Sequence, residues 1–184
     1  MRVFGIDPGS ERTGYGCIET DGSRHRIVLC GAITTPPSPA TFADKLLEIH
    51  VRLTALIGES RPDCVAVENL FHAINVRSAL KLGHARGVAM LAAVEAGVPV
   101  REYTPAEIKR AVVGYGRAEK HQVQHMVKLM LRLPAVPSPH DAADALAVAI
   151  CHVHAHAIAA PGRLANAMPA RSKATSWRQY RPSR

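Results

Sequence analysis

Four acidic residues stand at positions where a purely structural role is hard to assign. They lie in three distant segments of the chain and are Asp7, Glu68, Asp141 and Asp144. The first two end predicted strands, at residues 2–7 and 64–68, whereas the last two lie in a predicted helix. Residues three apart on a helix share one face, so Asp141 and Asp144 can point together toward a site above the strand ends.

Clustered carboxylates of this kind are suited to binding hard divalent cations. Mg²⁺ and Mn²⁺ prefer carboxylate and water oxygens in octahedral geometry. Two such ions about 4 Å apart can stabilise both the attacking and the leaving oxygen of phosphoryl transfer. Without a cation, carboxylates so close together would force at least one group to stay protonated. The acids therefore predict a metal-dependent hydrolase that acts on phosphodiesters.

Each acid also has a structural interpretation. Asp141 can belong to a capping box that begins at Ser138, and spacing alone favours neither interpretation. Asp7 precedes a Pro-Gly pair, which is common in turns. Asp144 lies in the second helical turn among small apolar residues, and Glu68 ends a buried strand, where an unpaired carboxylate costs free energy. A functional role is therefore favoured most for Asp144 and Glu68.

The elements that must position these acids follow the pattern of one α/β domain. Apolar and β-branched runs predict strands at residues 2–7, 13–20, 25–34, 64–68 and 98–103. Helical spacing and capping signals predict helices at residues 41–58, 76–96, 105–113, 118–132 and from about 140 onwards. Short turns make the first three strands antiparallel neighbours. In the second helix, apolar spacing with small Gly and Ala residues between predicts close packing against the sheet, with the apolar set Leu80, Leu82, Val88, Leu91 and Val94.

Length and composition are consistent with one domain and a polyanionic partner. The chain has 184 residues, 47% of them hydrophobic, which is enough for a single core at residues 1–158. Lys and Arg outnumber Asp and Glu by 23 to 15, which points toward a polyanionic partner such as nucleic acid or an acidic membrane surface. Residues 160–184 contain basic residues and no acid, so residues 159–184 are predicted to be a flexible basic tail.

The spacing of the cysteines and the length of the apolar runs favour a cytoplasmic location. The cysteines are widely spaced, do not form a CxxC pair, and are Cys17, Cys30, Cys64 and Cys151. Three of them lie in apolar runs, where they are expected to be small core residues. No apolar run reaches the length of about 18 residues that a membrane helix needs, and the N-terminus lacks a signal-peptide pattern. We expect a cytoplasmic protein without a membrane segment.

Several motifs resemble the RuvC family of Holliday junction resolvases. The matching segments occur in family order over residues 1 to about 157 and are Gly5-Ile6-Asp7-Pro8-Gly9, Thr13-Gly14-Tyr15-Gly16, Ala66-Val67-Glu68, Ala79-Leu80-Lys81-Leu82-Gly83, Val112-Val113-Gly114-Tyr115-Gly116-Arg117-Ala118-Glu119-Lys120 and Asp141-Ala142-Ala143-Asp144-Ala145-Leu146-Ala147. The resemblance implies an α/β protein with a ribonuclease H-like fold, in which a mixed sheet of about five strands carries helices on both faces.

The same resemblance implies an activity. The protein would bind a four-way DNA junction as a homodimer and place symmetrical nicks in two strands of like polarity, in recombination and DNA repair. Mg²⁺ would be the cofactor, with Mn²⁺ as a substitute and with two ions in each active site. The branch-migration proteins RuvA and RuvB are implied partners.

Individual residue roles follow from the resemblance. The catalytic and metal-binding acids of the family fall on Asp7, Glu68, Asp141 and Asp144. Its basic DNA-contacting positions fall on Lys109 and Lys120, and Phe71 matches an aromatic residue that the family uses at the junction, where stacking on unpaired bases is expected. Gly114 and Gly116, between the two lysines, would let the backbone approach a phosphate closely.

Two further residues belong to the predicted site. Several relatives carry a basic residue where this chain has Ile74. Either Arg77 supplies the missing junction contact, or the contact there is weaker. His140 immediately precedes the acidic pair, so it either assists a metal-bound water or has a structural role beside the helix cap.

Other functions share parts of this pattern. A ribonuclease H-like nuclease that acts on structured RNA would use the same acids, and a junction-binding protein without catalysis would share the basic surface. Residues 5–10 also resemble the first phosphate loop of the actin-like and sugar-kinase superfamily, whose members need two such domains, whereas 184 residues supply one. None of these alternatives accounts for all the motifs. The prediction is junction cleavage at a two-metal site in which Asp7 bridges the ions.

Overall fold

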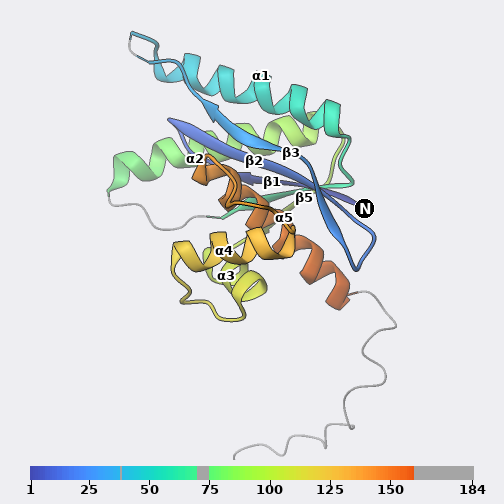
Figure 1. The fold of residues 1–184 in the computed structure, drawn as a ribbon. Coiled ribbons are helices and arrows are strands. Elements are labelled where there is room, and N and C mark those ends of the chain that lie inside the picture. Colours follow the sequence, from blue (N-terminus) through green and yellow to red (C-terminus); the bar gives the residue numbers. More distant parts are fainter. Residues whose placement is uncertain (38, 70–74, 160–184) are drawn as a thin grey trace, which may run out of the picture.

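A five-stranded mixed sheet lies at the centre of the computed structural model, which describes residues 1–37, 39–69 and 75–159 (Figure 1). Its strands are β1 (Arg2–Asp7), β2 (Arg12–Thr20), β3 (His25–Thr34), β4 (Cys64–Glu68) and β5 (Val100–Tyr103). They are ordered β3-β2-β1-β4-β5. The first three are antiparallel neighbours, whereas β4 runs parallel to both β1 and β5. The predicted mixed sheet is confirmed.

Helices cover both faces of this sheet. They are α1 (Phe42–Ser60), α2 (Val76–Glu95), α3 (Pro105–Val113), α4 (Lys120–Met130) and α5 (His140–Ala159). The helices α1 and α2 lie on one face, and α3, α4 and α5 lie on the other (Figure 1). Capping boxes begin α1 at Thr41 and α3 at Thr104. The helix α4 begins two residues later than predicted, because Glu119 caps it.

Alternation along β1 divides its side chains between two cores. Phe4 and Ile6 belong to the core beneath α1 and α2, whereas Val3 belongs to the core beneath α5. Successive side chains of a strand point to opposite faces of a sheet. Asp7 is therefore on the same side as Val3, facing the helix that carries the other two predicted acids.

The helix α5 lies directly against the sheet, because two strand residues have no side chain. A Cβ atom at Gly5 of β1 would stand 2.0 Å from the carbonyl oxygen of Ala145. A Cβ atom at Gly14 of β2 would stand 2.1 Å from the carbonyl oxygen of Asp141. Such close approach of two backbones requires glycine at both positions. The first turns of α5 are thereby placed beside the end of β1.

Alanines rather than the larger apolar residues bury α2, which corrects the prediction for this helix. Its buried residues are Ala85, Ala89, Ala92 and Ala93. Leu80, Leu91 and Val94 do not face the sheet and are 59%, 49% and 63% exposed. Close packing of α2 against its neighbours leaves space mainly for alanine, with Val88 and Met90 partly buried against the same core, so Leu80, Leu91 and Val94 occupy the outer face.

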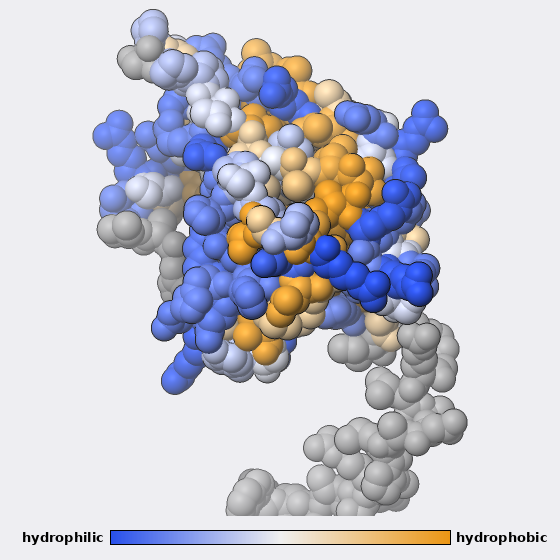
Figure 2. Space-filling model, in the orientation of Figure 1, coloured by the Kyte–Doolittle hydropathy of each residue, from blue (hydrophilic) through white to orange (hydrophobic). Residues whose placement is uncertain are grey.

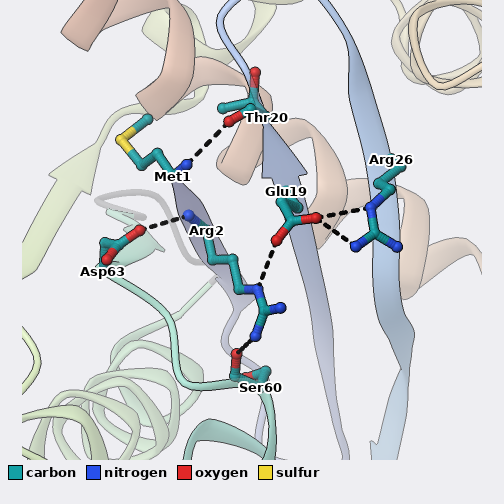
Figure 3. A network of polar contacts seen from close by, with 7 residues as sticks. All are labelled: Met1, Arg2, Glu19, Thr20, Arg26, Ser60 and Asp63. Atoms are coloured by element: carbon teal, nitrogen blue, oxygen red, sulfur yellow. Dashed lines mark hydrogen bonds and ion pairs between the residues drawn. The ribbon is translucent and has the colours of Figure 1, made fainter.

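A polar network occupies the end of the sheet opposite to Asp7 (Figure 3). The Arg2 guanidinium donates from Nε to Oε1 of Glu19 at 3.0 Å and from Nη1 to the carbonyl oxygen of Ser60 at 3.1 Å. Arg26 donates from Nε to Oε2 of Glu19 at 2.7 Å. The backbone amide of Arg2 donates to Asp63 at 2.7 Å. Both acids in this network thus have donors that stabilise their charge.

The structure bears on the cysteines and on the surface, whereas the predicted tail is not described. Cys17, Cys64 and Cys151 are buried, as predicted for core residues, and the four cysteines are free. Apolar side chains reach the surface in the middle of the view in Figure 2, between hydrophilic flanks. Within the described ranges, none of the helices combines the length and the apolar character that a membrane span requires. The predicted tail lies outside the described residues from position 160 onwards.

Candidate active site

Three of the four predicted acids line one cavity. Asp7 ends β1 and Glu68 ends β4, and these parallel strands are paired, so their carboxyl ends meet at the same edge of the sheet. Asp144 reaches the same cavity from α5. The cavity has a volume of about 300 Å³, and two lysines, Lys109 and Lys120, complete its charged lining. Side chains from five elements (β1, β4, α3, α4 and α5) therefore line one cavity, and three of the acids lie together there as the sequence predicted.

Burial and mutual repulsion change the protonation of these acids. Burial, followed by the charge and hydrogen bond of Glu68 and by the charge of Asp144, raises the pKa of Asp7 to about 8. Burial also raises the pKa of Glu68, although a hydrogen bond from Asp7 opposes this effect. At neutral pH, Asp7 is therefore the protonated partner that donates to Glu68. The pair has the strained electrostatics that a bound cation would relieve.

The two lysines partly neutralise the cavity. Lys120 begins α4, and its Nζ lies 2.6 Å from Oδ2 of Asp144. This hydrogen bond is the main reason that the pKa of Lys120 is raised, with further contributions from the charges of Asp144, Asp7 and Asp141. The charge of Lys109 lowers the pKa of Glu68. Both lysines therefore act electrostatically on the acids, which the sequence alone did not indicate.

Asp141 is the one predicted acid that does not line the cavity. Its Oδ2 lies 3.1 Å from Nε of Arg12, which begins β2. In the structure its carboxylate is thus paired with Arg12. Its charge nevertheless reaches Lys120, so it lies near the site. Sequence reasoning missed Arg12, because an ion pair between distant segments leaves no local pattern.

The donor set fits hard divalent ions in chemistry, although its side chains are not arranged as a complete ligand set. Among the described residues, no group of three or more acids, histidines or cysteines is placed so that it could hold a metal ion. Lys120 and Arg12 are the partners of Asp144 and Asp141 instead. Carboxylate oxygens are the ligands that Mg²⁺ and Mn²⁺ prefer, and the proton between Asp7 and Glu68 marks an excess of negative charge.

The other predicted site residues have different locations. Gly114 ends α3 in a left-handed conformation with φ of 98°, and Gly116 follows it in the turn before α4. Arg77 is exposed in the first turn of α2, and His140 is exposed at the first position of α5; neither lines the cavity. Phe71 lies outside the described residues, as does Ile74.

Comparison with known proteins gives relatives over most of the chain. The family model described as crossover junction endodeoxyribonuclease RuvC matches residues 3–152. Crossover junction endodeoxyribonuclease RuvC of Pelobacter propionicus is 53% identical over 182 residues, which cover 99% of this chain and 100% of that protein. The protein of the same name from Syntrophotalea carbinolica is 57% identical over 154 residues, covering 84% and 94%.

Solved structures give a matching result. The structure of Thermus thermophilus RuvC in complex with Holliday junction substrate is 36% identical in sequence to this chain. It superposes with a TM-score of 0.82 over 86% of this chain and 96% of that one. The similarity therefore extends over nearly all of the folded part, including each strand and helix that carries a predicted acid.

Proposed function

The chain belongs to the RuvC family of crossover junction endodeoxyribonucleases, and from this premise we propose that it resolves four-way (Holliday) DNA junctions by cutting phosphodiester bonds. Its fold is the ribonuclease H-like fold that the sequence predicted. The observation that carries the proposal is the cavity in which Asp7, Glu68 and Asp144 meet Lys109 and Lys120. The junction-bound relative supports the choice of substrate.

We infer that Mg²⁺, or Mn²⁺ in its place, is held by the four acids, with two ions in each site. Asp7 and Glu68 are the central ligands, because burial leaves them short of compensating positive charge. Asp144 and Asp141 complete the set once they leave their basic partners. When bound, the ions stabilise negative charge on the attacking and leaving oxygens of the scissile phosphate.

The residues of the chain itself prepare the site for a phosphate. Asp7 holds a proton while the cavity lacks a cation, and it releases that proton on becoming a ligand. Lys120 lies between the acids and the exposed surface, so it can exchange Asp144 for a phosphate oxygen. Lys109 supplies a second positive charge on the same lining. Pro105, Ile108 and Val123 form an apolar wall of the cavity, which limits the access of water to the charged side chains of the acids and lysines.

The turn between α3 and α4 places the two lysines where both would contact phosphates of the same DNA backbone. Gly114 reverses the chain after α3, and Lys120 then stands at the N-terminus of α4, where the helix dipole favours an anion. We propose Gly114, Gly116, Lys109 and Lys120 as backbone-phosphate contacts, so junction affinity should fall steeply with salt. Stacking by Phe71, phosphate contact by Arg77 and assistance by His140 stay predictions.

We also propose that two copies pair through the outer face of α2. Val76, Leu80 and Val94 are 75%, 59% and 63% exposed on this helix, although large apolar residues are usually buried. Glycines at positions 83 and 87 line a hollow of about 480 Å³ on the same helix, and in the proposed dimer this hollow would receive side chains of the second copy. A twofold pair would carry two active sites, one for each nicked strand. Assembly with RuvA and RuvB stays a prediction from the resemblance.

A labelled immobile four-way junction tests the proposed function. We expect purified protein to release two symmetrically nicked products in Mg²⁺ and none in EDTA. A linear duplex of the same sequence serves as the control substrate and should stay intact. Binding without any product in Mg²⁺ or Mn²⁺ would support the non-catalytic junction-binding protein instead, and preferred cleavage of structured RNA would support another ribonuclease H-like nuclease.

A further inference from the structure

Arg12 contacts an acid of the site although it does not line the cavity. It begins β2, and its Nε lies 3.1 Å from Oδ2 of Asp141 in the first turn of α5. The two side chains are 49% and 30% exposed, so water reaches the pair. The contact draws the Asp141 carboxylate toward β2, whereas Asp144, one turn further along, lines the cavity. The two acids of one helical face therefore point to different partners.

The backbone on the Arg12 side of this pair is firmly held. The buried Thr13 hydroxyl donates to the carbonyl oxygen of Gly9 at 2.8 Å and accepts from the Gly9 amide at 3.3 Å. The backbone amide of Thr35, also buried, donates to the carbonyl oxygen of Glu11 at 3.1 Å. These bonds close the turn between β1 and β2, so the guanidinium extends from a fixed position toward α5.

The backbone on the Asp141 side is equally constrained. Its carbonyl oxygen lies so near Gly14 that a Cβ atom there would stand 2.1 Å away. Neither β2 nor the start of α5 can shift toward the other, because their backbones are already in contact. The simplest way for Asp141 to change partner is therefore rotation of its side chain, without inward movement of either backbone.

We propose that Arg12 is a positioning residue that holds the Asp141 carboxylate apart from Asp7, Glu68 and Asp144 until a divalent ion competes for it. The inference rests on the proposed metal-dependent function. A guanidinium keeps its charge at all working pH values, so it can serve as a permanent counter-ion. It keeps a fourth carboxylate out of the metal-free cluster, where its charge would add to the repulsion already evident at Asp7.

The competition between Arg12 and the ion predicts a change in metal affinity. Exposed ion pairs contribute little free energy, so Arg12→Gln should tighten Mn²⁺ binding by about two- to fivefold. Binding of Mn²⁺ alone to the full chain, without DNA, is measured by calorimetry or by the EPR signal of free Mn²⁺. Arg26→Gln is the matched control, because Arg26 forms an exposed ion pair with Glu19 at the opposite end of the sheet. It should leave the Mn²⁺ affinity unchanged.

A double-mutant cycle separates positioning of Asp141 from a general effect of charge. If Arg12 acts through Asp141, the tightening caused by Arg12→Gln disappears when Asp141→Asn is already present. Equal tightening in both backgrounds, or no tightening in either, overturns the inference. Junction cleavage by the wild type in Mg²⁺ is measured in parallel. If the wild type cleaves the junction and binds Mn²⁺ but Arg12→Gln does not change the Mn²⁺ affinity, only this inference is wrong. If the wild type shows no cleavage and no Mn²⁺ binding, the proposed function is wrong as well.

Discussion

Acidic residues at the two ends of the strand pair β1 and β2 have pKa values that are shifted in opposite directions. At one end, Glu19 accepts hydrogen bonds from Arg2 and Arg26, and these bonds lower its pKa (Figure 3). At the other end, Asp7 is buried beside Glu68 and Asp144, and its pKa rises to about 8. The strands that connect the two ends are the same, so the difference lies in what neighbouring elements place beside each acid.

This contrast distinguishes Glu19, whose charge is compatible with the stability of the fold, from Asp7, whose charge would reduce stability but suits a catalytic role. Glu19 is on the surface, where arginines and water stabilise its charge. Asp7 has carboxylates as its nearest charged partners, and only Lys120 opposes them at a distance. Groups whose pKa is strongly shifted by burial and like charges cluster at functional sites. The four predictions below test whether the two ends differ in function as they differ in electrostatics.

The largest expected effect is the loss of nicking in Asp7→Asn. This change removes a central ligand charge, and losing several kcal/mol of transition-state stabilisation lowers the rate by about 10³-fold or more. Junction binding should persist, because phosphate contacts supply most of the affinity. Cleavage of a labelled junction and gel-shift affinity are measured side by side. Near-normal cleavage in Mg²⁺ would contradict the role assigned to Asp7.

Lys120→Met should have the next largest effect. Methionine keeps the length of the side chain without its charge, so Asp144 loses its partner and the phosphate loses a contact. We expect roughly 10²-fold slower cleavage, comparable to the loss of one charge-stabilising donor. The slope of log affinity against log salt should also fall by about one. An unchanged slope would show that Lys120 does not contact phosphate.

The stability of the metal-free protein should reveal the protonation of Asp7. Burial and the neighbouring acids raise its pKa from the ordinary 3.8 to about 8, so the folded state binds the proton more tightly than the unfolded chain does. The stability that this proton provides is complete below pH 4 and is lost as the pH rises toward 8, by on the order of a few kcal/mol. Asp7→Asn should flatten this dependence in urea unfolding. Mn²⁺ should raise the Tm of the wild type near pH 8 but raise that of the variant less, and equal slopes for both proteins would argue against the raised pKa.

The smallest effect is expected at the other end of the sheet. Glu19→Gln removes the charge that Arg2 and Arg26 contact, and exposed ion pairs of this kind contribute little, so the Tm should fall by no more than about 3 °C. Because the pKa of Glu19 is lowered in the fold, any stabilisation it provides is lost as the pH falls below its ordinary value. Cleavage should stay within about twofold of the wild type. A large loss of cleavage would mean that the two ends are functionally coupled.

The sequence was sufficient to predict the fold and the convergence of three acids. Period-two and helical patterns located each strand and helix, and capping signals at Thr41 and Thr104 located two helix starts. The sequence indicated that Asp7 and Glu68 each end a strand, and the structure shows that these strands are parallel neighbours whose carboxyl ends meet at one edge. The family resemblance supplied the remaining link to Asp144.

The errors share a physical cause, because each depends on contacts between distant segments. The outer location of Leu80 follows from how closely α2 packs on its alanines, and helical spacing alone does not show which face is buried. The pairing of Asp141 with Arg12 depends on how β2 and α5 meet. Repulsion between clustered acids correctly predicted that one of them keeps a proton, but that this acid is Asp7 depends on burial, which is a property of the folded state. None of these is encoded in a local pattern.

Backbone contact between β1, β2 and α5 has a consequence for how the protein can vary. Because no side chain separates Gly5 from Ala145, or Gly14 from Asp141, the spacing between helix and strands has no adjustable part. A single added methyl group at either glycine would push the helix outward and move both of its carboxylates together, away from Asp7. Activity should therefore be lost by Gly5→Ala even though position 5 has no reactive group.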